Sequence, residues 1–289
     1  MQLKIFSPML ATSLPNLDTL GDRFWAIEPK LDGIRVIATV DAAQGWVTFQ
    51  TRNGHPLTTL GSCAPDLLKL GAAIGKPCSF DGEAIAGAGF YDGAGKLMKK
   101  DDTDADGIFA IFDLPWVEGW VATDGVPYLD RRKAITDAFD KAGLHSSERI
   151  KQVPIFDTIT TSCIDPEALV QKAISLGWEG VVLKDIEAPY YQGKRSKAWI
   201  KLKGSETYDC PIVGFVPGKG RYDGAAGALL INYLGTVVAV GSGLSDELRL
   251  AISDKPQEYI GKLAEVQCQE ITPNGSMRHP TLVKIRWDK

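Results

Sequence analysis

Short apolar runs separated by turn residues recur along most of the chain and constrain its fold more than any other feature. Residues 24–30, 34–40 and 46–52 are apolar or alternating runs of strand length, and a turn that ends in Gly45 separates the last two. Further runs of this kind occupy residues 79–86, 108–114, 179–184 and 198–203. Strand signals therefore dominate, and we expect antiparallel sheets.

Two segments predict helices among these strands. Residues 128–142 are amphipathic and are followed by Gly143, a residue type that commonly ends helices. Residues 165–176 begin with an Asp in the capping position, continue with Pro166 in the first turn and stop before Gly177. Strands and helices together predict an α+β architecture of sheets flanked by helices.

The pattern changes beyond Gly204. About five short strands with glycine-rich turns are expected at residues 212–216, 228–233, 236–241, 263–271 and 282–287. One short helix is expected among them, at residues 245–252. Five strands and one helix fit an OB-type β-barrel, a fold used repeatedly on nucleic acid. We therefore place a domain boundary near residues 204–208.

The overall charge leaves nucleic-acid binding open. A net charge of −4 gives no basic footprint, but phosphate binding requires only a local basic surface. Local basic clusters occur at residues 194–197, 201–203, 219–221 and 284–289.

The cysteines and the apolar runs bear on the compartment. The five cysteines are scattered and never in CxxC spacing, which indicates reduced thiols and argues against a disulfide framework and a zinc site. No apolar run approaches the roughly 18 residues that span a bilayer, and the N-terminus does not resemble a signal peptide. We expect a cytoplasmic protein with no membrane contact.

The segment from Lys30 to Arg35, with the sequence KLDGIR, carries the most reactive side chains and lies between two predicted strands. Its glycine allows the backbone to approach a ligand closely. The lysine supplies a nucleophile, Asp32 a carboxylate able to orient it, and the arginine a fork of donors for phosphate or ribose. Taken alone, so short a pattern also fits a solvated polar turn.

Five further motifs follow this segment along the chain. They are TRNG at residues 51–54, FDGEAI at 80–85, FDL at 112–114, EGVVLK at 179–184 and WIKLK at 199–203. In this order they resemble the motifs of the covalent nucleotidyltransferase superfamily, which contains ATP-dependent DNA ligases, RNA ligases and messenger-RNA capping enzymes. The ordered set is far more specific than any one motif.

The resemblance implies roles for individual residues. The catalytic set is Lys30, which becomes adenylylated, with Asp32, Lys201 and Lys203. The nucleotide contacts are Glu28 at the adenine edge, Arg35 and Glu83 at the ribose and metal, Phe112 stacked on adenine, and Arg195 and Lys201. The metal ligands are Glu83 and Glu179, and Arg52 matches the position that receives the 5′-phosphate of a nick.

The chemistry requires these residue types. A lysine amine with an unperturbed pKa of about 10.4 is mostly protonated at neutral pH and is then no nucleophile. Nearby cations, such as Lys201, Lys203 and a bound metal, favour the neutral amine. Attack on the α-phosphorus of ATP depends mainly on positioning and charge neutralisation, so carboxylates for Mg²⁺ and cations for phosphate oxygens are the expected parts.

The C-terminal part of the sequence resembles DNA ligases more specifically than the rest of the superfamily. Residues 220–230 and 240–246 look like the OB domain of DNA ligases, and residues 279–289 resemble the family's last motif, in which Arg286 and Lys289 reach the departing pyrophosphate. The resemblance thus implies a nucleotidyltransferase domain over residues 1–204 and an OB-fold domain over residues 205–289. Because the last motif serves only the first step, the OB domain is expected to close on ATP and then to clamp DNA.

An ATP-dependent DNA ligase that seals nicks through lysyl-AMP and an adenylylated 5′-phosphate is the function implied. NAD-dependent ligases carry an N-terminal nicotinamide-recognising domain and zinc cysteines, which we do not find, so the expected cofactors are ATP and Mg²⁺ (or Mn²⁺). The expected partner is nicked double-stranded DNA, bound by a monomer in a bacterial or phage-infected cell.

Two alternative functions remain open. An RNA ligase or a capping-type guanylyltransferase shares Lys30 and the carboxylates, and labelling with ATP or GTP would separate them from a DNA ligase. A catalytically silent nucleic-acid-binding module could keep the fold, although every expected reactive residue is present. Residues 102–107 mimic a calcium-binding EF-hand loop, but the strand expected at residues 108–114 leaves no helix after it.

Overall fold

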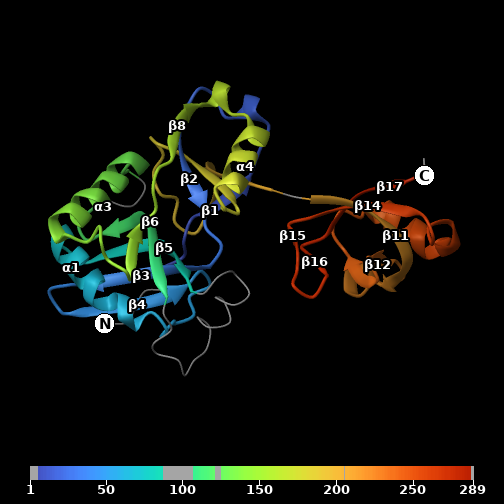
Figure 1. Cartoon of the computed structure of the whole chain (residues 1–289), viewed down its shortest axis with the longest axis horizontal. Coiled ribbons are helices and arrows are strands. Elements are labelled where there is room, and N and C mark those ends of the chain that lie inside the picture. Colours follow the sequence, from blue (N-terminus) through green and yellow to red (C-terminus); the bar gives the residue numbers. More distant parts are fainter. Residues whose placement is uncertain (1–5, 87–106, 121–124, 205, 288–289) are drawn as a thin grey trace. The chain divides into compact units, whose positions relative to one another are not determined.

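The computed structural model describes residues 6–86, 107–120, 125–204 and 206–287. The chain divides into two compact units, Met1–Lys203 and Gly204–Lys289 (Figure 1). Each unit has its own apolar core, and the α+β architecture expected from the sequence is confirmed. Among the described residues, no helix is long and apolar enough to cross a membrane.

The first sheet of the N-terminal unit carries the reactive motifs on its central strands. Its five strands follow the order β1 (Leu10–Ser13), β10 (Arg195–Lys203), β9 (Gly180–Asp185), β2 (Phe24–Lys30) and β8 (Asp157–Thr160). Strand β1 is parallel to β10, and the other neighbours are antiparallel. Segments far apart in the sequence are thus brought beside the strand that ends at Lys30.

The second sheet of this unit is built mainly from consecutive strands. Its order is β4 (Trp46–Thr51), β3 (Ile34–Asp41), β5 (Cys78–Ile85), β6 (Ile108–Val117) and β7 (Ile150–Gln152). Strand β7 is parallel to β6, and the other pairs are antiparallel. The short connection between β2 and β3, residues 31–33, joins the two sheets.

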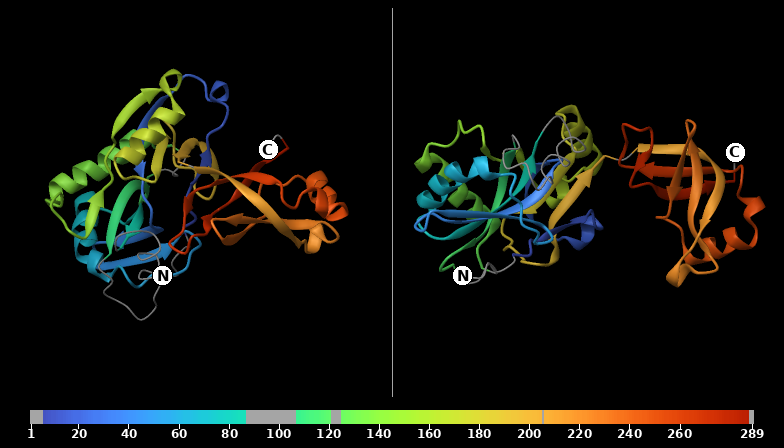
Figure 2. Two further views of the ribbon diagram at one scale, coloured as in Figure 1. Left: turned by 45° about the vertical axis from the view of Figure 1, so that its right-hand side comes forward. Right: turned by 90° about the horizontal axis from the view of Figure 1, so that it is seen from below.

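In the described part of this unit, three α-helices cover the sheets: α1 (Ala64–Ile74), α3 (Tyr128–Ala142) and α4 (Pro166–Ser175). Helices α1 and α3 pack against one face of the second sheet, where the largest apolar cluster lies (Figures 1 and 2). Helix α4 packs on β9 and β10 and covers the first sheet. A third apolar cluster, which includes Ile37 and Trp199, joins the uncovered faces of the two sheets.

Alternation along the strands sends side chains of β2 to opposite faces. Trp25 and Ile27 enter the apolar cluster beneath α4. Glu28 and Lys30 therefore point to the other face, toward the second sheet. The same alternation in β10 places Trp199 and Lys201 on the face of Lys30, while Ile200 lies beneath α4. The polar motif residues consequently gather between the two sheets.

Two motif glycines are required for close backbone packing. A Cβ atom at Gly180 would lie 2.1 Å from the carbonyl oxygen of Leu202 in the adjacent strand. A Cβ atom at Gly33 would lie 2.3 Å from the carbonyl oxygen of Ala84. Glycine therefore allows β9 to pair closely with β10, and allows the turn after Lys30 to rest on β5.

The C-terminal unit is a small β-barrel. Its main sheet has the order β13 (Thr236–Val240), β12 (Ala226–Tyr233), β11 (Glu206–Pro217), β14 (Leu263–Cys268) and β17 (Thr281–Arg286). A parallel bridge between Ser242 and Thr281 connects the two ends of this sheet, so the barrel closes. Helix α5 (Asp246–Asp254) packs on β12, and β15 (Glu270–Ile271) pairs with β16 (Met277–Arg278).

The sequence-based assignments were right for most long elements and wrong for several others. The bounds of β2 and α3 match the expected residues 24–30 and 128–142. The strand expected at residues 46–52 ends at Thr51, and the one expected at residues 263–271 is split into β14 and β15. Seven strands, rather than five, occur in the described part of the C-terminal unit. Helix α1 was missed.

Five single turns of 3-10 helix complete the described elements. They are η1 (Leu17–Thr19), η2 (Gly61–Cys63), η3 (Thr161–Cys163), η4 (Gly220–Tyr222) and η5 (Pro256–Glu258).

Candidate active site

Lys30 is the last residue of β2, and its ammonium group is paired with a carboxylate. The Nζ atom of Lys30 donates a short hydrogen bond to Oε2 of Glu179, the residue that precedes β9. The side chains are 25% and 13% exposed, so the pair is reachable from solvent. The structure thus joins the candidate nucleophile to a candidate metal ligand that is 149 residues away in sequence.

Strand register places the two lysines of β10 next to this pair. Lys30 is aligned with Gly180 in β9, and Gly180 is aligned with Lys203 in β10. Lys201 lies on the same face of β10 as Lys203, two residues earlier. Both side chains are half-buried.

Several basic side chains influence the pKa of Lys201. Burial lowers the pKa of Lys201, and the positive charges of Arg195, Lys30 and Arg52 lower it further, while Glu179 opposes them. Four of the predicted cations therefore act on one another electrostatically. Such a cluster attracts anions, because each added negative group offsets repulsion among the cations.

Arg35 is held in place by a carboxylate that the sequence analysis did not select. Its Nε and Nη2 atoms donate to the two oxygens of Asp81 in β5, at 2.9 and 2.6 Å. The buried hydroxyl of Tyr190 also donates to Asp81, at 2.6 Å. The guanidinium of Arg35 lies 5.4 Å from the ring of Phe112 and 5.3 Å from that of Trp199. This two-bond pairing fixes the plane of the guanidinium.

Glu83 lies on β5 directly opposite Arg35 and is half-buried. Burial raises the pKa of Glu83 to about 8, since the carboxylates of Asp81 and Glu179 reinforce the effect of burial and the cations of Lys30 and Arg35 oppose it. Two acids, Glu83 and Glu179, therefore repel each other at the site. An acid whose pKa is raised by burial and by neighbouring carboxylates is typical of functional sites.

The raised pKa of Glu83 makes stability depend on pH in metal-free protein. Glu83 keeps its proton up to about pH 8 in the folded state, whereas the unfolded chain releases it near 4.5. Between these values the folded state binds more protons, so the stabilisation is complete below about pH 4.5 and is lost as pH rises through about 8. In EDTA, we expect wild type to lose stability relative to Glu83→Gln over this interval.

Urea unfolding of both proteins across that pH range measures this difference. The exposed Glu187, substituted in the same way, serves as the matched control and should give a flat difference. A difference between wild type and Glu83→Gln that does not change with pH would contradict the assignment.

Glu28 is buried, only 2% exposed, and has three partners. Its Oε2 atom accepts from Nζ of Lys184 at 2.6 Å, and its Oε1 atom accepts from the hydroxyl of Tyr128 in a short hydrogen bond. Nη1 of Arg132 lies 3.7 Å from Oε1. The residue expected to read adenine is therefore anchored on several sides.

Lys184 also contacts Phe112, the residue expected to stack on adenine. Its Nζ atom donates to the carbonyl oxygen of Phe112 at 2.9 Å and lies 4.6 Å from the centre of that ring. The Phe112 ring is half-buried and packs edge-on against Trp199, with the ring centres 5.9 Å apart. Burial lowers the pKa of Lys184, although the carboxylates of Glu28 and Asp113 counteract it.

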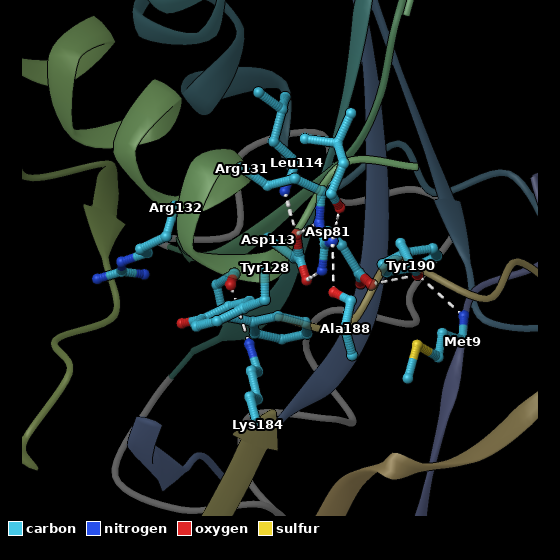
Figure 3. Close-up of polar contacts among 12 residues, drawn as sticks. Met9, Asp81, Asp113, Leu114, Tyr128, Arg131, Arg132, Lys184, Ala188 and Tyr190 are labelled. Carbon is cyan, nitrogen blue, oxygen red and sulfur yellow. Dashed lines mark hydrogen bonds and ion pairs between the residues drawn. The ribbon is translucent and has the colours of Figure 1, made fainter. Parts of the chain in front are cut away.

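A second buried ion pair, between Arg131 and Asp113, lies next to Phe112 in the chain (Figure 3). Nε and Nη2 of Arg131 donate to the two oxygens of Asp113, at 2.7 and 3.0 Å. Arg131 is 1% exposed and Asp113 is fully buried. Because Asp113 follows Phe112 directly, this pair links helix α3 to the position of the aromatic ring.

The remaining predicted residues of the N-terminal unit lie at its surface. Arg52 is exposed in the turn after β4, where Gly54 has a φ of 82° that favours glycine. Arg195 is exposed at the start of β10, and its Nη1 donates to the backbone of Ala11. Asp32 is half-buried in the turn after Lys30.

In the C-terminal unit, Arg286 ends strand β17 and forms ion pairs with two acids. Its Nη1 atom lies 3.5 Å from Asp209 and 3.2 Å from Glu265. Lys289, the other residue predicted to contact pyrophosphate, lies outside the described residues, as do residues 102–106 of the segment that mimics an EF-hand. Within the described ranges, no group of three or more His, Cys, Asp or Glu side chains could hold a metal.

Several residues that shape the site were not selected from the sequence. Asp81 and Lys184 lay within motifs that had been noted, and a charged residue in an otherwise apolar strand was the available signal. Tyr128 and Tyr190 gave no such signal, because a buried tyrosine cannot be distinguished in sequence from ordinary core. Their hydroxyls reach carboxylates 100 and 109 residues away in the chain.

Family models match both units of the chain. The model of the ATP-dependent DNA ligase domain covers residues 8–203, and that of the DNA ligase OB-like domain covers residues 217–286. The chain belongs to the ATP-dependent DNA ligase family. The resemblance inferred from the ordered motifs is thereby confirmed, and the residues around Lys30 lie within the matched ligase domain.

Curated relatives include longer ligases. The multifunctional non-homologous end joining protein LigD of Mycolicibacterium smegmatis is 27% identical over 98% of this chain and 39% of its own length. A DNA ligase of Methanoculleus marisnigri is 32% identical over 62% of this chain and 35% of its own length. The chain thus spans about two fifths or less of these relatives.

Solved ligase structures share the fold. The structure named Pmar-Lig_PreS3 is 25% identical with a TM-score of 0.84, covering 98% of this ligase-family chain and 68% of that one. Mycobacterial DNA ligase D complexed with ATP and MES is 25% identical with a TM-score of 0.53, covering 100% and 97%. A Lig E DNA ligase, at 22% identity and a TM-score of 0.68 over 96% and 98%, supports the fold alone.

Proposed function

We propose that this chain seals nicks in duplex DNA by ATP-dependent adenylyl transfer through Lys30. The observation that carries the proposal is the convergence on Lys30 of one carboxylate, Glu179, and of the cations around Lys201. A lysine in such surroundings can exchange its bound carboxylate for phosphate groups. The proposal assigns residues 1–204 to adenylyl transfer and residues 205–289 to an OB-fold domain.

The first step forms the covalent intermediate. The Lys30 amine attacks the α-phosphorus of ATP and forms a phosphoramide N–P bond. The bond from the α-phosphorus to the oxygen that bridges it to the β-phosphorus breaks, and pyrophosphate leaves with that oxygen. Lys201 and Lys203 lie where they can neutralise phosphate oxygens. Arg35, held by Asp81, offers donors to the nucleotide from the opposite sheet. In the adenylate-forming step, Arg286 and Lys289 would contact the pyrophosphate.

The acidic residues fit a divalent cation. Glu83 and Glu179 would hold the cation, and its positive charge would offset the repulsion from Glu179 that helps to raise the pKa of Glu83. Two carboxylates supplemented by substrate phosphates are a typical Mg²⁺ environment. When bound, Mg²⁺ would neutralise charge that develops on the phosphate oxygens. Glu179 would then serve the cation as well as Lys30, with which it is paired in this structure.

The next two steps use DNA. The 5′-phosphate of the nick attacks the adenylate, which breaks the bond to Lys30 and forms a pyrophosphate linkage between AMP and DNA. The adjacent 3′-hydroxyl then displaces AMP and forms the phosphodiester. Arg52 is exposed and its positive charge acts on Lys201, which supports its proposed contact with this phosphate.

A single assay tests the proposal. The protein is incubated with α-labelled ATP and Mg²⁺, and the label is followed from protein to nicked DNA and then to free AMP. We expect label on protein first, then on the 5′-phosphate, with sealed duplex as product. Labelling by GTP alone would favour a capping-type guanylyltransferase, and joining of nicked RNA alone would favour an RNA ligase. Absence of any label on the protein would contradict all three of these functions.

Arg52 separates the DNA steps from the first step. Because its exposed guanidinium is proposed to bind the 5′-phosphate, Arg52→Ala should slow joining by roughly tenfold or more while lysine labelling changes less than about twofold. Single-turnover measurements of each step check this. His55→Ala, in the same turn and also exposed, should change neither. Equal losses in labelling and joining by Arg52→Ala would contradict this role.

A further inference from the structure

Three residues surround the carboxylate of Glu28, and we call them the Glu28 clamp: Tyr128, Arg132 and Lys184. Each carboxylate oxygen accepts one hydrogen bond, from Tyr128 and Lys184 respectively, and Arg132 adds a second positive charge 3.7 Å away. All three residues are buried (Figure 3). A carboxylate accepts about four hydrogen bonds, two on each oxygen. Each oxygen of Glu28 can therefore accept one hydrogen bond more than the clamp provides.

Helix α3 supplies two members of the clamp from one face. Tyr128 and Arg132 are separated by four residues, so their side chains lie next to each other along the helix. Pro127, at the helix N-cap, accepts from the backbone of Arg131, and the backbone amides of Tyr128 and Leu129 donate to the chain at Ala188 and Ile186. The first turn of α3 is therefore tied to the sheet that carries Glu28.

Arg132 contains a donor that has no hydrogen-bond partner. Its Nη2 atom donates to the carbonyl oxygen of Val153, but its buried Nη1 atom donates to no group. Buried donors are rarely left without an acceptor. Because Nη1 lies only 3.7 Å from Oε1 of Glu28, a small movement of either side chain would complete a hydrogen bond.

The hydrogen-bonding pattern of the Glu28 carboxylate distinguishes the two purine bases. An ionised carboxylate only accepts hydrogen bonds, whereas the neutral form also donates. Adenine presents an amino donor where guanine presents the O6 acceptor. The Glu28 carboxylate can therefore accept from the amino group of adenine, whereas it would face the O6 acceptor of guanine without a hydrogen bond.

We propose that Tyr128, Arg132 and Lys184 are positioning residues that hold the Glu28 carboxylate in place, and that they thereby set the preference for ATP over GTP. The inference rests on the proposed function, because it assumes that a purine nucleotide is transferred to Lys30. A site built around a hydrogen bond rejects a ligand that cannot make it, since the site's own polar group is then left unpaired. Helix α3 thus acts on substrate choice without touching the nucleotide.

The test measures lysine labelling by ATP and by GTP for wild type and variants. Tyr128→Phe removes one hydroxyl and little volume, and Lys184→Met removes the ammonium. We expect each to lower the ATP-to-GTP ratio of labelling efficiency by about tenfold, mainly through a higher KM for ATP. Glu28→Gln, which adds a donor, should bring the ratio close to one.

Tyr190→Phe is the matched control. It removes a buried hydroxyl that also donates to a carboxylate, but to Asp81 rather than Glu28. Its ATP-to-GTP ratio should remain that of wild type even where its activity falls. An unchanged ratio in both Tyr128→Phe and Lys184→Met, with a collapsed ratio in Glu28→Gln, would overturn the clamp. Absence of any label in wild type would instead remove the proposed function.

Discussion

Lys30→Arg should abolish lysine adenylylation and ATP-dependent joining, by about 10⁴-fold or more. Arginine keeps the positive charge that pairs with Glu179, so the fold and the ion pair can persist. The guanidinium remains protonated and cannot form the phosphoramide bond. Label transfer from α-labelled ATP and gel-based joining of nicked DNA measure both losses, and circular dichroism should be unchanged.

A preformed adenylylated nick distinguishes the covalent step from the later one. Since that substrate already carries AMP, Lys30→Arg should join it at a rate far closer to wild type than it joins an ordinary nick. Lys133→Arg is the matched control, because Lys133 is an exposed lysine paired with Asp137 on α3. ATP-dependent joining that survives Lys30→Arg would show that another residue carries the adenylate.

Asp113→Ala should cost about 3–5 kcal/mol of unfolding free energy, because it leaves the buried guanidinium of Arg131 without its carboxylate. For a unit of this size the loss corresponds to a fall of roughly 6–20 °C in Tm. Thermal and urea unfolding measure it. Arg131 would retain bonds to two backbone carbonyls, which cannot replace the lost negative charge.

Two further variants check that the effect arises from the buried charge. Asp137→Ala breaks the exposed pair with Lys133 and should change the stability by less than about 1 kcal/mol. The double variant Asp113→Leu with Arg131→Met removes both charges, and we expect it to recover part of the loss. If Asp113→Ala were as stable as wild type, the pair would not support the site as described.

Regular patterns explain which elements could be predicted from the sequence. Strand β2 has an apolar run that ends at the charged Lys30, and α3 repeats buried residues at helical spacing before Gly143. Helix α1 was missed, because it has no side-chain N-cap and contains Gly71, which usually weakens a helix. Gly71 is needed there, since a Cβ atom would lie 2.6 Å from Val40.

The ordered motifs predicted the family and most residues that converge at the site. They could not predict the pairings, because partners such as Arg35 and Asp81 lie 46 residues apart and meet only through strand register. The sequence analysis also predicted that Glu28 contacts the nucleotide, but it did not predict the residues that hold the Glu28 carboxylate in place. Those anchors come from α3 and β9, whose packing no local pattern encodes. The roles of individual residues remain predictions.

The mass of the intact protein after incubation with ATP and Mg²⁺ tests the central claim most directly. Covalent catalysis through Lys30 predicts a gain of one adenylate, located on Lys30 by peptide mapping and removed by added pyrophosphate. A mass that stays unchanged, or an adenylate bonded to a different side chain, would contradict the account.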